Sequence, residues 1–571
     1  MKYTGARVVI ECLVEQGVDI VFGYPGGAIL NIYDELYKNR DRVFHILTAH
    51  EQGATHAADG YSRSTGKTGV VMATSGPGAT NLVTGIATAY MDSIPMVAIT
   101  CNVASHLLGK DSFQEIDITG ITMPITKHNY IVNNVDVLAD TIREAFLIAQ
   151  LGRPGPVLID IPKDVTAAFT DYHPPVVGFA SKTPNQLTRA SIRRVTKISS
   201  PSDDDIKRFA SIINASQKPF LYVGGGVLAD NAWDELKILA EKRNIPVATS
   251  LMGRSAFPSD HSLYTGMIGM HGTKASNAGV NNSDLVIVLG ARFSDRVVSN
   301  HSKFAHNSKI IQIDIDPAEV NKNITVADAL VGSIKECLTR LLPLIEERAP
   351  SDWNEQLDQW KLHLPAMFSK KTKLHPKFAF EHIGKKLDGD SIIVTEVGQH
   401  QMWASQFYPF TKPRTFLTSG GLGTMGFGTG AAIGAQLANP KKRVVHIAGD
   451  GSFRMNSTEL STIFHYQLPI IILVINNGTL GMVRQWQNLF YNKRYSETTL
   501  DFGPDFVKLA EAYGITGYRA GTEDEFIETF DKALALHKPV LIDCGMNIDE
   551  MVFPMVPAGK PIDELLLEVE P

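Results

Sequence analysis

The sequence is short of cysteine, of long apolar runs and of excess positive charge. Cys12, Cys101, Cys337 and Cys544 are scattered along 571 residues, so they predict neither a disulfide framework nor a zinc site. No apolar run is long enough to span a bilayer, and the first residues show no signal or transit pattern. The net charge of −6, without a basic cluster, argues against nucleic acid as a partner. We therefore expect a cytoplasmic protein that neither crosses a membrane nor binds nucleic acid.

The length and the patterning of the chain predict several domains. At 571 residues, with 44% hydrophobic and 20% charged residues, the chain is too long for a single core. Short apolar runs alternate with helical patterns, as in the βαβ units of a parallel sheet. These runs lie at 20–23, 70–74, 96–100 and 157–161, then at 219–223, 285–289 and 310–315, and finally at 444–448 and 470–475.

We predict an α/β fold with three successive doubly wound parallel-sheet domains. The domains should cover residues 1–165, 190–345 and 375–545, and a proline-bearing C-terminal tail should follow at 546–571. Polar connectors are expected at 166–203 and from residue 348 onward. After residue 4 the chain should enter a helix directly.

Two strand ends of the third domain carry the most informative residues. One predicted strand ends at Gly449-Asp450-Gly451-Ser452, the next at Asn476-Asn477-Gly478-Thr479, and a helical pattern at 456–466 separates them. Such a unit brings both strand ends to one edge of the sheet. The carboxylate of Asp450 and the amide oxygen of Asn477 are hard ligands that suit Mg²⁺, while Gly451 and Ser452 can present N–H groups to phosphate. Turn chemistry explains either piece alone, but the pair is much harder to explain that way.

The pair of strand ends resembles the diphosphate-binding motif of thiamine-diphosphate enzymes. The resemblance implies thiamine diphosphate and Mg²⁺ as cofactors, with Gly449, Gly451 and Ser452 at the diphosphate. It also implies three metal ligands, which are the side chains of Asp450 and Asn477 and the backbone carbonyl of Thr479. Met455 resembles the apolar support under the bent cofactor.

Glu51 is the candidate acid of the first domain. It follows an apolar run at 43–47 and opens a helical pattern among small or apolar neighbours, which makes burial plausible. A solvated acid favoured by the helix dipole is the alternative from the residues alone. In thiamine-diphosphate enzymes such a carboxyl comes from the N-terminal domain and activates the aminopyrimidine held by a neighbouring subunit. The resemblance therefore implies catalysis by Glu51, further cofactor contacts at Pro25, Gly76 and Asn81, and a homodimer or homotetramer.

Five further segments look like those of acetohydroxyacid synthase (acetolactate synthase). They are FGYPGGA at 22–28, GKDSFQE at 109–115, ITKHN at 125–129, GMVRQWQ at 481–487 and PMVPAGKP at 554–561. Because they run through the whole chain in order, the chain resembles the large, catalytic subunit of that family. The resemblance implies a transferase that decarboxylates pyruvate and joins it to a second pyruvate or to 2-oxobutanoate. The products would be 2-acetolactate or 2-aceto-2-hydroxybutanoate, for the synthesis of valine, leucine and isoleucine.

The same resemblance assigns the substrate entrance. One subunit would contribute Gly27, Phe113, Gln114 and Lys127, and the other would contribute Met482 and Trp486. From residue type alone, Trp486 suits a core position and Lys127 a surface charge equally well.

The middle domain resembles the FAD-binding domain of the anabolic enzyme. Glycines after strands let the backbone approach a pyrophosphate, and arginines can pair with it. The candidates are Gly224, Gly225, Gly226, Met270, His271, Gly272, Gly290, Arg292, Asp295, Arg296 and Asp314. The chain departs from the family at Ser294 and Ser333, where Asp is usual, and at Asn102 and Ala104.

Other functions stay open at this point. The nearest alternative is a catabolic, FAD-free acetolactate synthase of acetoin and butanediol formation, and a non-catalytic subunit that only regulates a partner is another. Simple 2-oxo-acid decarboxylases are disfavoured because their adjacent histidine pair is absent, and glyoxylate carboligase because it lacks the acid found here at Glu51. A small regulatory subunit is a possible partner.

Overall fold

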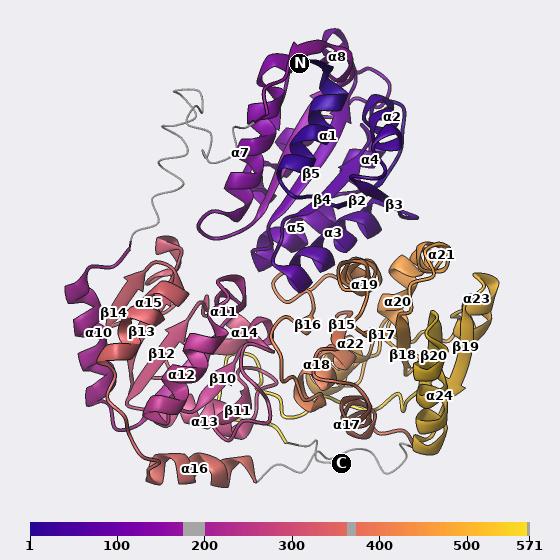
Figure 1. Ribbon diagram of the computed structural model, residues 1–571. Helices are drawn as coiled ribbons and strands as arrows, with labels where there is room; N and C mark the ends of the chain where they lie inside the picture. The colour runs from indigo at the N-terminus through magenta and orange to yellow at the C-terminus, as the bar shows by residue number, and fades with distance from the viewer. Residues whose placement is uncertain (175–199, 363–372, 568–571) are drawn as a thin grey trace.

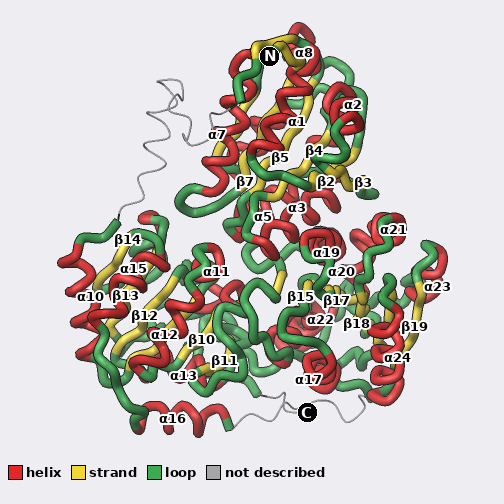
Figure 2. The backbone as a smooth tube through the Cα atoms, viewed as in Figure 1, coloured by secondary structure: helices red, strands yellow, loops and turns green. Residues whose placement is uncertain are grey.

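The computed structural model describes residues 1–174, 200–362 and 373–567 and consists of three α/β domains (Figure 1). In each domain, helices lie on both faces of a six-stranded parallel sheet (Figure 2). The predicted α/β fold with three parallel sheets is therefore confirmed.

The N-terminal domain has the strand order β3-β2-β4-β5-β7-β6. Its strands are β2 (Ile20–Tyr24), β3 (Phe44–Leu47), β4 (Gly69–Ala73), β5 (Met96–Asn102), β6 (His128–Ile131) and β7 (Pro156–Pro162). Its helices are α1 (Gly5–Glu15), α2 (Leu30–Lys38), α3 (Glu51–Thr65), α4 (Pro77–Thr80), α5 (Val83–Asp92), α6 (Ile118–Thr122), α7 (Leu138–Gln150) and α8 (Lys163–Ala167).

The central domain has the strand order β11-β10-β9-β12-β13-β14. Its strands are β9 (Pro219–Val223), β10 (Val247–Thr249), β11 (Tyr264–Met267), β12 (Leu285–Leu289), β13 (Lys309–Asp314) and β14 (Asp328–Val331). Its helices are α10 (Asp203–Ala215), α11 (Gly226–Ala229), α12 (Trp233–Arg243), α13 (Lys274–Asn282), α14 (Asp295–Val298), α15 (Ile334–Leu341) and α16 (Asp352–Lys361).

The C-terminal domain has the strand order β16-β15-β17-β18-β20-β19. Its strands are β15 (Ile392–Thr395), β16 (Phe416–Leu417), β17 (Val444–Gly449), β18 (Ile471–Asn476), β19 (Thr516–Ala520) and β20 (Val540–Gly545). Its helices are α17 (Pro376–Lys386), α18 (Gln399–Phe407), α19 (Phe427–Ala438), α20 (Asp450–Asn456), α21 (Leu460–His465), α22 (Gly481–Phe490), α23 (Phe506–Ala512) and α24 (Glu523–Leu536).

Three local predictions differ from the structure. The chain begins with strand β1 (Lys2–Thr4), which pairs antiparallel with β8 (Phe169–Asp171) inside the predicted first connector; residues 175–199 of that connector lie outside the described residues. The second connector contains α16, whose Trp353 is buried. In place of one helix at 456–466, the structure has a 3₁₀ turn (Ser457–Glu459) followed by α21, and a separate helix, α20, precedes them at Asp450–Asn456.

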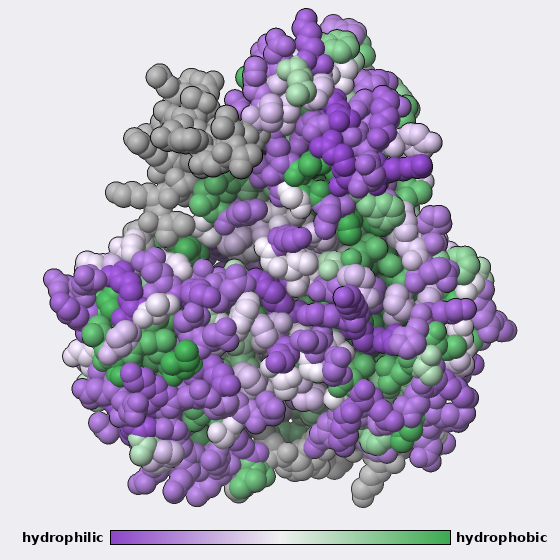
Figure 3. Space-filling view, in the orientation of Figure 1, coloured by the Kyte–Doolittle hydropathy of each residue, from purple (hydrophilic) through white to green (hydrophobic). Residues whose placement is uncertain are grey.

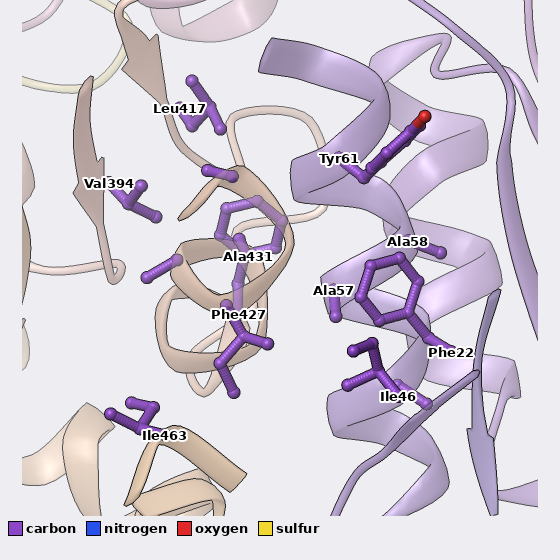
Figure 4. Close-up of a cluster of buried hydrophobic side chains, with 14 of the residues drawn as sticks. Phe22, Ile46, Ala57, Ala58, Tyr61, Val394, Leu417, Phe427, Ala431 and Ile463 are labelled. Carbon is purple, nitrogen blue, oxygen red and sulfur yellow. The ribbon is translucent and has the colours of Figure 1, made fainter. Parts of the chain in front are cut away.

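Helices α3 and α19 join the N-terminal and C-terminal domains into one hydrophobic core. Figure 4 shows Phe22, Ala57 and Tyr61 of the first domain facing Phe427 and Ala431 of the last. Small residues allow this close approach. A Cβ atom at Gly434 would collide with the Ala57 carbonyl, and one at Gly60 with the Ala431 backbone. The backbones of α3 and α19 are therefore in direct contact where the two domains bury surface against each other.

The C-terminal tail crosses back onto the central domain (Figure 1). The Val556 amide donates to the Met270 carbonyl at 2.8 Å, and the Asn277 side chain donates to the Ile562 carbonyl at 2.7 Å. Ile562 is buried in the core of the central domain. The tail thus packs on the central domain.

No helix in the described ranges is both long and apolar enough to cross a membrane. On the face shown in Figure 3, hydrophobic residues gather along the seam between the N-terminal and C-terminal domains. The exposed large apolar side chains include Tyr24, Leu47, Leu422 and Met455.

Candidate active site

The predicted metal ligands lie at neighbouring strand ends of the C-terminal sheet. Strands β17 and β18 are parallel, and Gly449 pairs with Ile475. Asp450 and Asn477 follow these paired positions by one and two residues, so both leave the sheet at its carboxyl edge. Ligands bind at this edge in open α/β sheets.

The Asp450 carboxylate is buried and incompletely satisfied. Its Oδ2 atom has no hydrogen-bond partner within the described part of the chain. Burial raises the pKa of Asp450 to about 6, because a charged carboxylate is poorly solvated there. A bound cation would supply the missing partner, so this residue fits a metal ligand.

Asn477 and Thr479 also have oxygens available for a metal. The Asn477 Nδ2 atom donates to Oε1 of Gln399 at 3.1 Å, which leaves Oδ1 for other partners. Thr479 pairs with Thr499 in an isolated antiparallel bridge. The hydrogen bonds of that bridge join the neighbouring Gly478 carbonyl and Leu480 amide to the other strand, so it leaves the Thr479 carbonyl unused.

The phosphate candidates occupy the first turn of α20. Leu480 packs directly against Gly451, and only glycine fits there without a shift of Leu480. A Cβ atom at position 451 would come within 2.5 Å of Leu480 Cδ2. Ser452 is buried, and its hydroxyl is engaged with Gly449, so its backbone amide is the group available to an anion. Met455, at the far end of α20, is 58% exposed, so its apolar side chain is accessible to a ligand.

Glu51 is buried at the start of α3. Only 9% of its surface is exposed, so the alternative of a solvated first-turn acid is wrong. Its Oε2 atom accepts a hydrogen bond from Asn81 Nδ2 at 2.9 Å. Gly78, in the turn that includes Gly76, lies against Oε1, where a Cβ would come within 3.3 Å. Glu51, Gly76 and Asn81 are thus brought together, while Pro25 lies exposed at the end of β2.

Within one chain, the first turn of α3 meets a different part of the C-terminal domain. The amides of Ala49 and His50 donate to the Glu459 carboxylate at 3.1 and 3.0 Å. Glu459 is the last residue of the short 3₁₀ helix that follows α20. It therefore lies only four residues after Met455. These contacts fix the position of α3 on its own C-terminal domain.

The four entrance residues of the N-terminal domain lie in loops. Gly27 is exposed with open space around it, and Phe113 is 87% exposed. Gln114 has a positive φ of 60° and lies against Gly76. Lys127 is half-buried, and its ammonium group donates to the carbonyls of Ile148 and Leu151 at the end of α7. Burial lowers the pKa of Lys127 to about 8.

The two entrance residues of the C-terminal domain lie on α22. Met482 and Trp486 are both half-buried, and the Trp486 ring packs edge-on against Phe490. The guanidinium of Arg296 lies 5.8 Å from the centre of the Trp486 ring. An FAD candidate and a substrate candidate therefore touch each other.

The glycine loops of the central domain pack on one another. Gly224 and Gly226 follow β9, and Gly290 follows β12. The backbone of Gly290 lies so close to Gly224 and Gly226 that neither position can hold a Cβ atom. At Gly225 a Cβ atom would lie 3.3 Å from Met252, so only a small shift of Met252 would be needed. Two of the three glycines after β9 are thus required by packing between loops.

Charged groups line the same edge of the central sheet. Arg292 is half-buried and has no ion-pair partner among the described residues, and burial lowers its pKa. Asp314 ends β13, and burial raises its pKa to about 6. An unpaired arginine beside glycine loops, with an acid at the next strand end, fits the pyrophosphate and ribose of a dinucleotide.

The remaining FAD candidates lie where the tail docks. Met270 and His271 are buried, and Gly272 packs against the Met267 carbonyl. The His271 ring lies 3.1 Å from the Pro554 carbonyl, and burial lowers its pKa to about 4. Asp295 is exposed in the first turn of α14.

Comparison with protein families matches each domain separately. The thiamine pyrophosphate enzyme N-terminal TPP binding domain matches residues 3–121, the central domain of these enzymes matches 206–341, and their C-terminal TPP binding domain matches 396–544.

Curated relatives match nearly the whole chain. The acetolactate synthase large subunit of Corynebacterium glutamicum is 47% identical over 98% of this chain and 89% of its own length. The acetolactate synthase of Mycobacterium bovis is 46% identical over 99% of this chain and 91% of its own length. The large subunit of Haemophilus influenzae is 42% identical over 99% and 98%.

The chain belongs to the acetolactate synthase family. The resemblance predicted from the sequence is thereby confirmed, and so is membership of the thiamine pyrophosphate enzymes.

The departures from the acetolactate synthase pattern preserve local structure. Ser294 and Ser333 begin α14 and α15, where their side chains accept from the amides of Arg296 and Glu336. Serine and aspartate are both good N-caps. The Ser333 hydroxyl also donates to Asp230 at 2.7 Å, whereas an aspartate there would repel that carboxylate. Asn102 donates to Asp160 and to the Ile116 carbonyl.

The sequence prediction missed Gln399 and His400 at the start of α18. Both are buried at the carboxyl end of β15, next to β17. The His400 ring lies against Gly449, and its Nε2 atom has no partner in the described residues. The apolar run at 392–394, followed by Gly398 before a helix, was the signal for a third strand end at this edge.

Proposed function

We propose that this chain is the large, catalytic subunit of an acetolactate synthase. It joins pyruvate, after decarboxylation on thiamine diphosphate, to a second pyruvate or to 2-oxobutanoate in the synthesis of branched-chain amino acids. The observation that carries the proposal is the buried, unsatisfied Asp450 oxygen beside Asn477, in a chain 42–47% identical to acetolactate synthases over nearly its full length.

Asp450, Asn477 and Thr479 would hold Mg²⁺ through a carboxylate, an amide oxygen and a backbone carbonyl, a set of oxygen ligands that this ion prefers. Gly449, Gly451 and Ser452 would bind the diphosphate at the first turn of α20. When bound, thiamine diphosphate supplies a carbon nucleophile that attacks a 2-oxo acid and accepts electrons as CO₂ leaves.

Glu51 would exchange a proton with the ring nitrogen of the aminopyrimidine. Asn81 donates a hydrogen bond to its Oε2 atom, and burial limits the access of water to the side chain. Because the first turn of α3 contacts Glu459 in its own chain, we propose that Glu51 serves the diphosphate site of a second subunit in a homodimer or homotetramer. The exposed apolar residues Tyr24, Leu47 and Met455 support such an interface.

The substrate entrance would combine loops of one subunit with α22 of the other. The half-buried Trp486 offers apolar surface to the additional methyl group of 2-oxobutanoate. Such a contact can supply only ~1–3 kcal/mol of discrimination. Gly27, Phe113, Gln114 and Lys127 would line the opposite wall.

We further propose that the central domain binds FAD, with Arg292 facing the pyrophosphate. The half-buried, unpaired guanidinium supports this assignment. The relatives named large subunits favour the biosynthetic enzyme over the catabolic alternative, and they suggest a small regulatory subunit as a partner. Four buried free cysteines agree with a cytoplasmic location.

A cofactor-resolved assay tests the function. We expect acetolactate from pyruvate only when thiamine diphosphate and Mg²⁺ are present, a second product when 2-oxobutanoate is added, and a yellow protein with a flavin absorption band. An active but colourless protein, indifferent to FAD, would support the catabolic alternative. A protein without activity under all these conditions would support a regulatory subunit.

A further inference from the structure

A chain of hydrogen-bonded side-chain amides leads from the half-buried Asn477, through the buried Gln399 and Gln485, to the C-terminal tail. Asn477 Nδ2 donates to Gln399 Oε1 at 3.1 Å, and Gln399 Nε2 donates to Gln485 Oε1 at 3.0 Å. Gln399 and Gln485 are 4% and 2% exposed. Because water does not reach these amides, their partners within the protein decide which way each one points.

The backbone of the tail fixes the direction of this amide chain. The Val552 amide donates to Gln485 Oε1 at 2.8 Å, and Gln485 Nε2 donates to the Val552 carbonyl at 3.1 Å. The backbone N–H and C=O of Val552 cannot exchange their roles as donor and acceptor, so the Gln485 amide has one favourable orientation. Gln399 Nε2 also donates to the Glu550 carbonyl at 2.8 Å, which gives Gln399 the same constraint.

The orientation of Gln399 determines which atom of Asn477, the predicted metal ligand, is left for the metal. If Gln399 presents its oxygen to Asn477, then Asn477 must present its nitrogen to Gln399, and its Oδ1 atom is left for the metal. A reversed Asn477 amide would place two oxygens against each other and turn an NH₂ group toward the cation. Gly481 leaves room for this arrangement, because a Cβ atom there would collide with Gln399 and lie 2.7 Å from Asn477 Nδ2.

We propose that Gln399 and Gln485 are positioning residues that orient the Asn477 amide, with the backbone N–H and C=O of Val552 as the fixed reference. The proposal rests on the proposed function, since it needs a metal at Asp450 and Asn477. It makes the tail part of the metal site rather than only a cover over the central domain. It also links that site to α22, which carries both Gln485 and the entrance residue Trp486.

Metal binding tests the proposal directly. Mn²⁺, a paramagnetic substitute that accepts the same oxygen ligands as Mg²⁺, is titrated into the full-length protein with thiamine diphosphate, and free Mn²⁺ is followed by electron paramagnetic resonance. Gln485→Met, which removes the amide at similar length, should weaken Mn²⁺ binding by about 10-fold or more, as for other residues that orient metal ligands. Gly481→Ala should do the same by displacing the amides.

Arg484→Met is the matched control. Arg484 lies on the same helix and pairs with Asp549 of the same tail at 2.8 Å, but it is outside the amide chain. Its loss should change Mn²⁺ binding by less than about 3-fold, because the Asp549 carboxylate is largely exposed and such an ion pair contributes little. Melting temperatures measured on all variants show that they are folded.

A double mutant separates positioning from general loosening. Asn477→Asp offers oxygen in either orientation, so Gln485→Met should have little further effect on Mn²⁺ binding in the Asn477→Asp background. Wild-type affinity in both Gln485→Met and Gly481→Ala, or an undiminished effect of Gln485→Met in that background, would overturn the proposal alone. If the wild-type protein shows no Mn²⁺ binding that depends on thiamine diphosphate, the proposed function fails first and the proposal fails with it.

Discussion

Asn81 donates a hydrogen bond to the carboxylate of Glu51 at 2.9 Å, across 30 residues of sequence. The pair brings the start of α3 and the end of α4 together at the carboxyl edge of the N-terminal sheet. We expect Glu51→Gln to lower turnover by about 100-fold or more, because the substitution removes a group that transfers protons. Binding of thiamine diphosphate, followed by quenching of tryptophan fluorescence, should remain. Glu528→Gln, on the exposed face of α24, is the control, and near-normal turnover in Glu51→Gln would refute the role of Glu51.

Asp450 should destabilise the protein in the absence of metal. Its pKa rises from 3.8 to about 6 on folding, so the folded state favours the neutral form. The protonated Asp450 therefore favours the folded state over the unfolded one. This stabilisation by the bound proton is fully present below pH 3.8 and is lost as the pH rises through 6, where the buried carboxylate becomes charged. Asp450→Asn should raise the melting temperature of the metal-free protein at pH 7 and abolish the stabilisation by Mg²⁺ with thiamine diphosphate. Unchanged stabilisation by these ligands would exclude Asp450 as a metal ligand.

A buried ion network ties the first domain to the last. Arg63 pairs with Asp59 and Asp92 and donates to the Thr418 carbonyl at 2.9 Å. Arg63→Met leaves two buried carboxylates without their cation, so the free energy of unfolding should fall by about 3–5 kcal/mol. Arg208→Met removes exposed ion pairs with Asp205 and Asp328 and should lower the free energy of unfolding far less, because exposed ion pairs contribute little. Urea titrations at equal protein concentration give both values, and equal losses would contradict this interpretation.

The close packing of α3 on α19 predicts strong sensitivity to added volume. Gly434→Ala places a methyl group against the Ala57 backbone, and overpacking of this kind typically destabilises by ~1–3 kcal/mol. Gly521→Ala meets only the end of Glu525, at 3.6 Å, and should be nearly neutral. Thermal unfolding of both variants measures the difference, and a Gly434→Ala protein as stable as the wild type would show that the helices can move apart.

Flavin content tests the central domain. Arg292→Gln removes the half-buried cation that no described residue pairs with, so the purified protein should contain several-fold less FAD. Arg208→Met again serves as a control, since Arg208 lies on α10 and is already paired. Full flavin occupancy in Arg292→Gln would remove Arg292 from the FAD site.

Sequence patterns predicted the sheets well because their strands are continuous apolar runs. Strands β9 and β12 match the predicted runs residue for residue. Asp450 and Asn477 could be placed at one edge because a βαβ unit forces parallel strand ends together. Strand β1 could not be predicted, since its three residues are held by pairing with β8, about 165 residues later in the chain.

Other features of the site depend on contacts between residues far apart in the chain, which a local sequence pattern does not reveal. Gln399 and Gln485 look like ordinary polar helix residues until the tail is seen to cover them. Likewise, the glycines at 224 and 226 suggested a ligand loop, but packing against Gly290 already requires them. The roles assigned to the individual site residues and the domain limits stay predictions.

The contact between α3 and the C-terminal domain also bears on how the chain folds during its synthesis. Arg63 and its acceptor Thr418 are 355 residues apart. At 5–20 residues per second, a ribosome needs about 20–70 s to make the residues between them. During that interval the N-terminal domain exists with the apolar face of α3 uncovered. We therefore expect the nascent chain to bind chaperones, because its final core can close only after the third domain has left the ribosome.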